Sequence, residues 1–132
     1  MTGTGVGESG APRTGRLKSR WDVVGGVRLH ARVSVDPVPA GSLPVVLVHG
    51  LGVSSGYMVP AAEHLAPFYR AYAPDLPGFG RSDKPRQVLD VAELAGALAA
   101  WMDAVGLKRA AFLGNSLGCQ IIAEFAVRQP SR

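Results

Sequence analysis

The 132-residue sequence contains a single cysteine, Cys119, so no disulfide can form within the chain and nothing indicates an oxidising compartment. Residues 1–20 lack the apolar stretch of a secretory signal, and no window approaches the roughly 20 apolar residues that cross a membrane. No metal-ligand cluster, phosphate-binding loop or dinucleotide fingerprint occurs, so we expect no metal and no cofactor. These absences favour a cytoplasmic protein without a membrane span.

The net charge is also small outside the first residues of the chain. The net charge is +4, and residues 1–20 hold +3 of it, because four basic side chains face one acid, Glu8; the four are Arg13, Arg16, Lys18 and Arg20. Residues 21–132 therefore carry only +1, which predicts no basic face and no nucleic-acid partner. With 47% apolar residues, the chain is long enough for one domain with a sizeable core.

What the sequence does contain is an alternation of strand-like and helix-like segments. Residues 1–18, rich in Gly, Thr and Ser, are predicted to be a disordered leader, and residues 19–132 to be folded. Period-two alternation on both sides of Gly25-Gly26 predicts a β-hairpin. Further strands are expected at 45–48, 69–73 and 110–113, with helices ending near 66, running from 90 to 106, and from 117 to about 128. This order predicts an α/β fold: an antiparallel first hairpin, then parallel strands with helices on both faces.

The most informative motif is Gly114-Asn115-Ser116-Leu117-Gly118, between an expected strand and an expected helix. This Gly-x-Ser-x-Gly pattern is typical of a nucleophile elbow, a sharp turn that forces the serine into a strained backbone conformation with its hydroxyl at the tip. Glycines are needed on both sides, because a side chain there would collide with the neighbouring strand or helix. The alternative is a buried serine that caps the following helix, which would not require the flanking glycines.

Two more motifs precede the elbow, namely His49-Gly50-Leu51-Gly52 and the segment 75–83, which reads Asp-Leu-Pro-Gly-Phe-Gly-Arg-Ser-Asp. In this order and spacing the three motifs resemble the α/β-hydrolase superfamily, in its serine-nucleophile branch, over about residues 21–132. The resemblance implies that the third strand lies beside the fifth. It also implies that the chain is the N-terminal half of such a domain, truncated after the nucleophile helix.

The resemblance also implies roles for single residues. Ser116 would be the nucleophile, and the backbone N–H groups of Leu117 and Leu51 would be the oxyanion donors, with Gly52 a less direct contributor. His49 would shape the oxyanion loop and would not act as the base. The residues that support the motifs are His49, Gly50, Gly52, Gly114, Asn115 and Gly118.

The remaining titratable residues are expected to have structural roles. His30 and His64 belong to no motif and are expected to be ordinary surface or packed histidines. Asp75 is expected to anchor the glycine-rich loop, and Asp83 to pair with Arg81 or to cap a turn. Cys119, one helical turn beyond the nucleophile, has no base and is expected to be a small packing residue.

The catalytic triad is incomplete in this sequence. No histidine follows Ser116, and the one acid after it, Glu124, lies on the predicted nucleophile helix. In the family, the acid and then the histidine follow the serine along the chain. We therefore expect the isolated chain to be a poor catalyst.

The resemblance implies a serine hydrolase that cleaves an ester, thioester or activated C–C bond of a small acyl substrate through an acyl-Ser116 intermediate. Cofactor-free haloperoxidase-like enzymes and acyltransferases share the motifs. A serine at 116 argues against haloalkane dehalogenases and epoxide hydrolases, which need an aspartate there. The alternative function is a non-catalytic remnant or an interaction module that pairs with a complementary chain. With no partner on its far side, the fifth strand would form a bare sheet edge, which predicts self-association.

Overall fold

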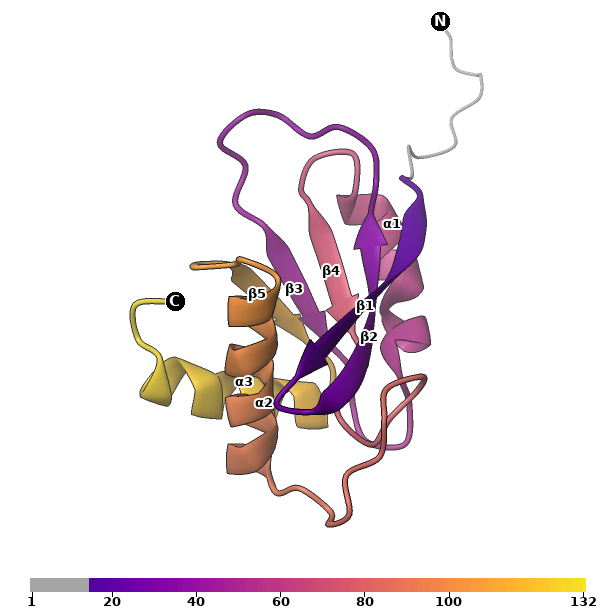
Figure 1. Ribbon diagram of the computed structural model, residues 1–132. Coiled ribbons are helices and arrows are strands. Elements are labelled where there is room, and N and C mark those ends of the chain that lie inside the picture. The colour runs from indigo at the N-terminus through magenta and orange to yellow at the C-terminus, as the bar shows by residue number, and fades with distance from the viewer. Residues whose placement is uncertain (1–14) are drawn as a thin grey trace, which may run out of the picture.

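The computed structural model describes residues 15–132, which contain a five-stranded sheet in the order β1-β2-β4-β3-β5 (Figure 1). Its strands are β1 (Leu17–Val24), β2 (Val27–Ser34), β3 (Val45–Val48), β4 (Ala71–Pro74) and β5 (Ala111–Gly114). β1 and β2 form the predicted antiparallel hairpin, whose turn is made by Gly25 and Gly26 at φ of +56° and +80°. β3 pairs in parallel with both β4 and β5. The predicted α/β fold is confirmed, and so is the crossover that places the third strand beside the fifth.

The start of the folded part differs from the prediction. Residues 1–14 of the expected leader lie outside the described residues, so their disorder stays a prediction. β1, however, begins at Leu17, inside the expected leader. The physical reason is that the Leu17 side chain packs against the apolar cluster formed by β3, β4 and the segment 58–62. Residues 17 and 18 therefore belong to the sheet.

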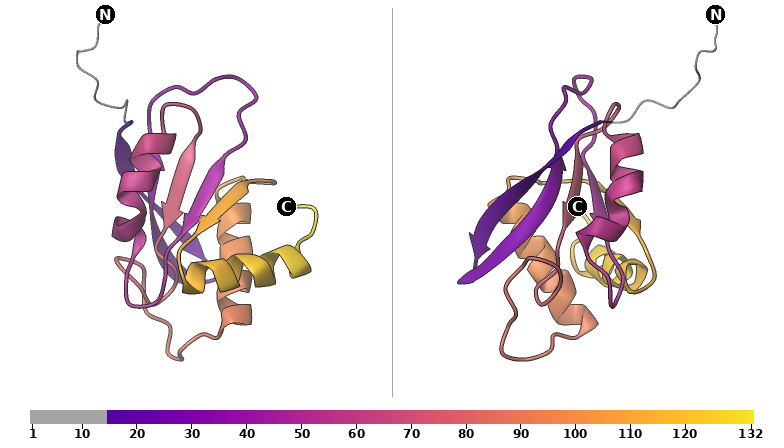
Figure 2. Two further views of the ribbon diagram at one scale, coloured as in Figure 1. Left: turned by 180° about the vertical axis from the view of Figure 1, so that it is seen from behind. Right: turned by 90° about the vertical axis from the view of Figure 1, so that its right-hand side faces the viewer.

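Helices cover both faces of the sheet, as predicted; they are α1 (Val59–Leu65), α2 (Val91–Ala104) and α3 (Leu117–Arg128). α1 packs on one face against Val45 and Leu47, whereas α2 and α3 pack on the other face in the same cluster as Val46 and Val48. The edge-on view of Figure 2 shows α1 and α2 on opposite sides of the sheet. All four side chains of β3 are buried, which explains its unbroken apolar run.

Two helices show how local side chains set helix ends. The helix expected up to about residue 66 is split into a 3-10 helix, η1 (Ser55–Met58), and α1, with Ser54 Oγ accepting from the Gly56 N–H ahead of η1. α2 begins at a capping box: the Asp90 carboxylate accepts from the Glu93 N–H at 2.8 Å, and the Glu93 carboxylate accepts from the Asp90 N–H at 3.0 Å. This start at Asp90 is the predicted one.

Candidate active site

Ser116 lies at the sharp turn between β5 and α3. Its φ of +55° and ψ of −115° fall outside the helix and strand regions, and it is the one non-glycine residue with positive φ among residues 15–132. Its side chain is exposed and caps no N–H group of α3. The alternative of a buried helix-capping serine is therefore wrong. A non-glycine residue in such a conformation stores backbone strain, a feature that concentrates at functional sites.

The glycines on both sides of Ser116 are required by close backbone packing. A Cβ on Gly114 would lie 2.8 Å from the Cys119 nitrogen, inside the first turn of α3. A Cβ on Gly118 would run into the carbonyl group of Val48, at the end of β3. The pattern of the motif therefore follows from the tight passage of the chain between β3 and α3.

A third glycine places the loop after β3 against the elbow. A Cβ on Gly50 would lie 2.9 Å from the Asn115 carbonyl oxygen and 3.3 Å from Ser116 Cβ. Leu51 follows directly, with a side chain that is 71% exposed, and Gly52 then turns the backbone at φ of +78°. The structure thus brings the two predicted oxyanion segments, around Leu51 and around the elbow, to the same place.

The Leu117 N–H group stands at the first position of α3. The next two N–H groups, of Gly118 and Cys119, donate to the carbonyl groups of Asn115 and Ser116 at 2.9 Å. An N–H at the first position of a helix has no intrahelical acceptor, and the positive end of the helix dipole favours negative charge there. The start of α3 can therefore stabilise an anion formed on the Ser116 side of the turn.

His49 is fully buried beneath the loop after β3 and has both ring nitrogens engaged. The Leu76 N–H donates to His49 Nε2 at 3.1 Å, so Nδ1 carries the hydrogen and donates to the Gly50 carbonyl at 2.9 Å. Burial lowers the pKa of His49, although the Gly50 carbonyl and the charge of Asp75 act in the opposite direction. A neutral ring with these two bonds ties the segment after β3 to the segment after β4.

Asp75, at the end of β4, is the centre of a buried polar cluster, here called the Asp75 cluster, which also includes His30, Ser55 and the backbone of Arg81. Its carboxylate accepts from Ser55 N–H at 2.7 Å, from His30 Nδ1 at 2.7 Å and from Arg81 N–H at 3.2 Å. Burial alone would raise the pKa of Asp75, but the hydrogen bonds outweigh it and hold this pKa below its usual value. The expected anchoring of the glycine-rich loop is present, since Arg81 belongs to that loop.

Three expectations for neighbouring side chains are corrected. Asp83 does not pair with Arg81; its carboxylate accepts from the Arg28 N–H at 3.0 Å, because the loop folds back onto β2. Cys119 is exposed and does not serve in packing, because α3 turns this position toward solvent. His30 is more than an ordinary packed histidine, since it joins the Asp75 cluster at zero exposure. The sequence does not predict this partnership, because His30 belongs to no motif and its partner Asp75 lies 45 positions away along the chain.

No histidine is bonded to Ser116 among residues 15–132. His30 is held by Asp75, and His49 by the segments around it. His64 lies on α1, where its Nδ1 bonds to the Pro60 carbonyl. Glu124 pairs with Arg128 within α3. The described part of the chain thus presents a serine in an elbow without a bonded base.

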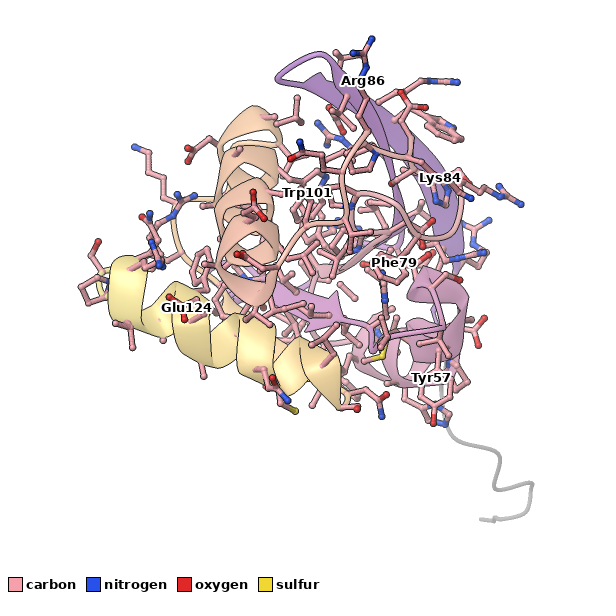
Figure 3. The ribbon with its side chains drawn as sticks, turned by 90° about the horizontal axis from the view of Figure 1, so that it is seen from below. Tyr57, Phe79, Lys84, Arg86, Trp101 and Glu124 are labelled. Atoms are coloured by element: carbon pink, nitrogen blue, oxygen red, sulfur yellow. The ribbon has the colours of Figure 1, made fainter. Side chains whose placement is uncertain are left out.

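A largely apolar cavity of about 290 Å³ adjoins both predicted oxyanion segments. Its lining includes Leu51, Phe79, Lys84, Val88, Leu94 and Leu117. Figure 3, seen from below relative to Figure 1, shows Phe79 between Lys84 and Tyr57 in that view. In the described residues there is no group of three or more His, Cys, Asp or Glu side chains that could hold a metal ion. Over the same range, none of the helices has the length and apolar character needed to cross a membrane.

The family model for the alpha/beta hydrolase fold matches residues 44–132, which include the loop after β3, the glycine-rich loop and the elbow. This chain is an alpha/beta hydrolase family member. Abhydrolase domain-containing protein abhd-5.2 of Caenorhabditis elegans is 32% identical over 103 residues, covering 75% of this chain and 23% of that protein.

Solved structures of this family share the fold, but their names indicate enzymes that catalyse different reactions. A bacterial membrane phospholipase A superposes with a TM-score of 0.79 at 30% identity, over 86% of this chain and 36% of its own. A loop variant of the haloalkane dehalogenase DbeA from Bradyrhizobium elkanii superposes with a TM-score of 0.79 at 25% identity, over 87% of this chain and 37% of its own. The chain thus spans well under half the length of these relatives.

Proposed function

We propose that this alpha/beta hydrolase carries the nucleophile and the oxyanion-stabilising backbone of a serine hydrolase that acts on small acyl substrates. The observation that carries the proposal is Ser116 itself, exposed and held at φ of +55° between two glycines that admit no side chain. Because the relatives' names cover both a phospholipase and a dehalogenase, the fold alone does not select the reaction. A serine at the elbow favours acyl transfer.

In the proposed reaction, Ser116 Oγ attacks the carbonyl carbon of an ester and its proton passes to a histidine. The carbonyl electron pair moves to oxygen, where the Leu51 and Leu117 N–H groups donate to the resulting oxyanion. Collapse of this intermediate expels the alcohol, which takes the proton from the histidine, and leaves an acyl group on Ser116 that water then hydrolyses. Each backbone donor typically contributes about 3 kcal/mol to the transition state.

The activating histidine and its carboxylate are proposed to come from outside residues 15–132. All three histidines of this sequence are either held by other groups or placed on α1, and the family order puts the acid and the histidine after the serine. The cavity beside Leu51 and Leu117 is proposed to receive the apolar part of the acyl group, since Phe79, Val88 and Leu94 line it.

The test is turnover of a chromogenic short-chain ester by the full-length protein and its Ser116→Ala variant. We expect Ser116→Ala to lower kcat by about 1,000-fold or more, because the covalent step is lost. Cys119→Ala is the matched control: the thiol is exposed one helical turn away on α3, and its removal is expected to leave kcat within about twofold of the wild type. Retention of more than a tenth of the activity by Ser116→Ala would contradict the proposal.

The second candidate, an interaction module, is favoured by one observation. In the described residues β5 is an edge strand of the sheet, and it exposes Leu113. Such an edge can pair with another strand, either from a second copy or from a complementary chain. Sedimentation of the 132-residue chain tests pairing with a second copy: a concentration-dependent dimer that Leu113→Lys disrupts would support it, and a monomer at all concentrations would contradict it.

A further inference from the structure

A second serine, Ser19 on β1, stands at the end of a chain of hydrogen bonds that the elbow does not share. Ser19 Oγ lies 2.8 Å from His30 Nε2, and His30 Nδ1 lies 2.7 Å from Asp75 Oδ2. The three residues come from β1, β2 and the end of β4, which the antiparallel pairing of β2 with both neighbours brings together. The result is a serine, histidine and aspartate in hydrogen-bonding sequence.

The direction of these hydrogen bonds follows from the charge of Asp75. Its carboxylate is an acceptor only, so the hydrogen on the imidazole lies on Nδ1 and points at Asp75. His30 Nε2 is then an acceptor, so the Ser19 hydroxyl donates its hydrogen to it. Arg81 Nη1 lies 3.4 Å from Ser19 Oγ. Because the guanidinium group can only donate, it does not accept the Ser19 hydroxyl hydrogen, which points at His30 Nε2.

The three residues differ in exposure. An activated serine requires such a difference, because its base has to be shielded from solvent while the serine itself has to be accessible. His30 is fully buried and Asp75 is 2% exposed, whereas Ser19 is exposed. The Trp21 ring packs on His30, with ring centroids 4.8 Å apart. The base is therefore shielded from solvent, while the residue that carries the hydroxyl lies at the surface. The Arg81 guanidinium lies 3.4 Å from Ser19 Oγ, next to the place where negative charge would develop on the oxygen of an attacked carbonyl group.

We propose that Ser19 is a second nucleophile, which accepts an acyl group from an activated ester with His30 as general base and Asp75 as the residue that positions His30. Ser19 Oγ forms a bond to the carbonyl carbon while its proton passes to His30 Nε2. The carbonyl electron pair moves to oxygen, beside the Arg81 guanidinium. When the pair returns, the bond to the leaving oxygen breaks, and the leaving group takes the proton from His30. The products are acyl-Ser19 and an alcohol or phenol.

This inference does not depend on the elbow. Every residue that it invokes lies among the described residues, and none of them is located in the loop after β3 or in α3. The two proposals can therefore fail separately, and the experiment is done in the full-length protein with Ser116→Ala, so that the elbow serine cannot react.

A fluorophosphonate reagent is the probe, because it forms a stable Ser–O–P bond with release of fluoride. The rate of labelling is measured for each serine by mass spectrometry of digested protein. Ser42 is the internal control: its hydroxyl donates to the Pro39 carbonyl at 2.7 Å and has no histidine partner. We expect Ser19 to react about 100-fold faster than Ser42, the low end of what general base catalysis supplies. Equal rates at Ser19 and Ser42 would overturn the proposal.

Two variants test whether His30 and Arg81 activate Ser19, or whether Ser19 reacts only because it is exposed. His30→Gln keeps a polar group but removes the base, and should bring Ser19 down to the rate of Ser42. Arg81→Gln removes the guanidinium but keeps the backbone N–H that Asp75 holds, so we expect the fold to remain and labelling to slow about tenfold. Unchanged labelling in folded His30→Gln would overturn the proposal. If that variant does not fold, the comparison of Ser19 with Ser42 decides by itself.

Discussion

Two polar regions lie at the same end of the sheet, the Asp75 cluster after β4 and the elbow after β5, and their polar groups are satisfied very differently. The Asp75 carboxylate is 2% exposed and accepts three hydrogen bonds. Ser116 is exposed, has positive φ and makes no capping bond. Both regions meet at the loop after β3, because Asp75 holds Ser55 while Gly50 packs against Ser116.

The difference shows how a strained site is maintained. A buried carboxylate with all its donors in place fixes the loops around it, and removal of any donor is costly. An elbow stores strain that the surrounding structure has to overcome. We infer that the Asp75 cluster stabilises the loop on which the elbow rests. Substitutions in the cluster should therefore also change the conformation of Ser116, whereas substitutions in the elbow should leave the cluster intact.

The largest effect is expected for Gly118→Ala. The added methyl group would run into the Val48 carbonyl, so the elbow must move away from β3. We expect ester turnover to fall about 1,000-fold, to the level of Ser116→Ala, and the free energy of unfolding to fall by about 3 kcal/mol. Kinetics and urea unfolding measure the two effects.

The matched control is Gly96→Ala, on the exposed side of α2, where a Cβ would meet nothing within 4 Å. Alanine favours a helix interior over glycine by about 1 kcal/mol, so this variant should be slightly more stable and fully active. If Gly118→Ala behaved like Gly96→Ala, the close packing of the elbow on β3 would not be essential.

Asp75→Asn is expected to have the next largest effect, on stability first and activity second. The amide cannot accept all three hydrogen bonds, which leaves buried donors unpaired and costs about 3 kcal/mol of unfolding free energy. Asp83→Asn is the control in the same loop: this carboxylate is exposed and accepts one N–H, and its loss should cost less than about 1 kcal/mol. Equal losses in the two variants would contradict the distinction between buried cluster and exposed loop.

The same carboxylate predicts a pH dependence of stability. The pKa of Asp75 is lower in the folded protein than in the unfolded chain, so its stabilisation is complete above the unfolded pKa and is lost as the pH falls through the folded one. Urea unfolding between about pH 2 and pH 6 should therefore show an acid loss of stability that is smaller in Asp75→Asn.

Asp36 provides the surface comparison for this pH prediction. Its pKa is also lowered, by the Arg16 backbone N–H and guanidinium, but the pair lies at the surface, where salt and water weaken it. Asp36→Asn should leave the acid loss of stability almost unchanged. An equal change in Asp36→Asn and Asp75→Asn would mean that burial of the cluster is not what makes it important.

The smallest effect is expected at a site remote from both regions. Asp90→Ala removes the capping box at the start of α2 and should lower the unfolding free energy by about 1 kcal/mol, with ester turnover unchanged. Thermal unfolding measures the first effect and kinetics the second. A loss of turnover with this modest destabilisation would show that activity follows overall stability and not the integrity of the elbow.

The features that sequence predicted correctly are those encoded by short segments. Gly114 of the elbow, which packs on Cys119, the hairpin turn at Gly25-Gly26 and the capping box at Asp90 each act on residues a few positions away. The partnership of His30 with Asp75 could not be predicted in this way, because 45 positions separate them and only the pairing of β2 with β4 joins them.

Other differences have similar tertiary causes. Trp101 on α2 is one example, since it is only 1% exposed. It packs edge-on against Tyr72 of β4, with ring centroids 6.0 Å apart, so the buried face of α2 is wider than the helical period alone indicates. The exposure of Cys119 likewise depends on how α3 sits on the sheet, which its own sequence does not specify.

The proposed role of Ser116 as the covalent nucleophile can be tested by trapping the acyl-enzyme intermediate. The full-length protein is mixed with an ester whose acyl group leaves slowly, quenched with acid during turnover and digested for mass spectrometry. We expect the added acyl mass on the peptide that contains Ser116, and its loss in Ser116→Ala. Turnover with no adduct at Ser116, or with an adduct at Ser19 alone, would contradict it.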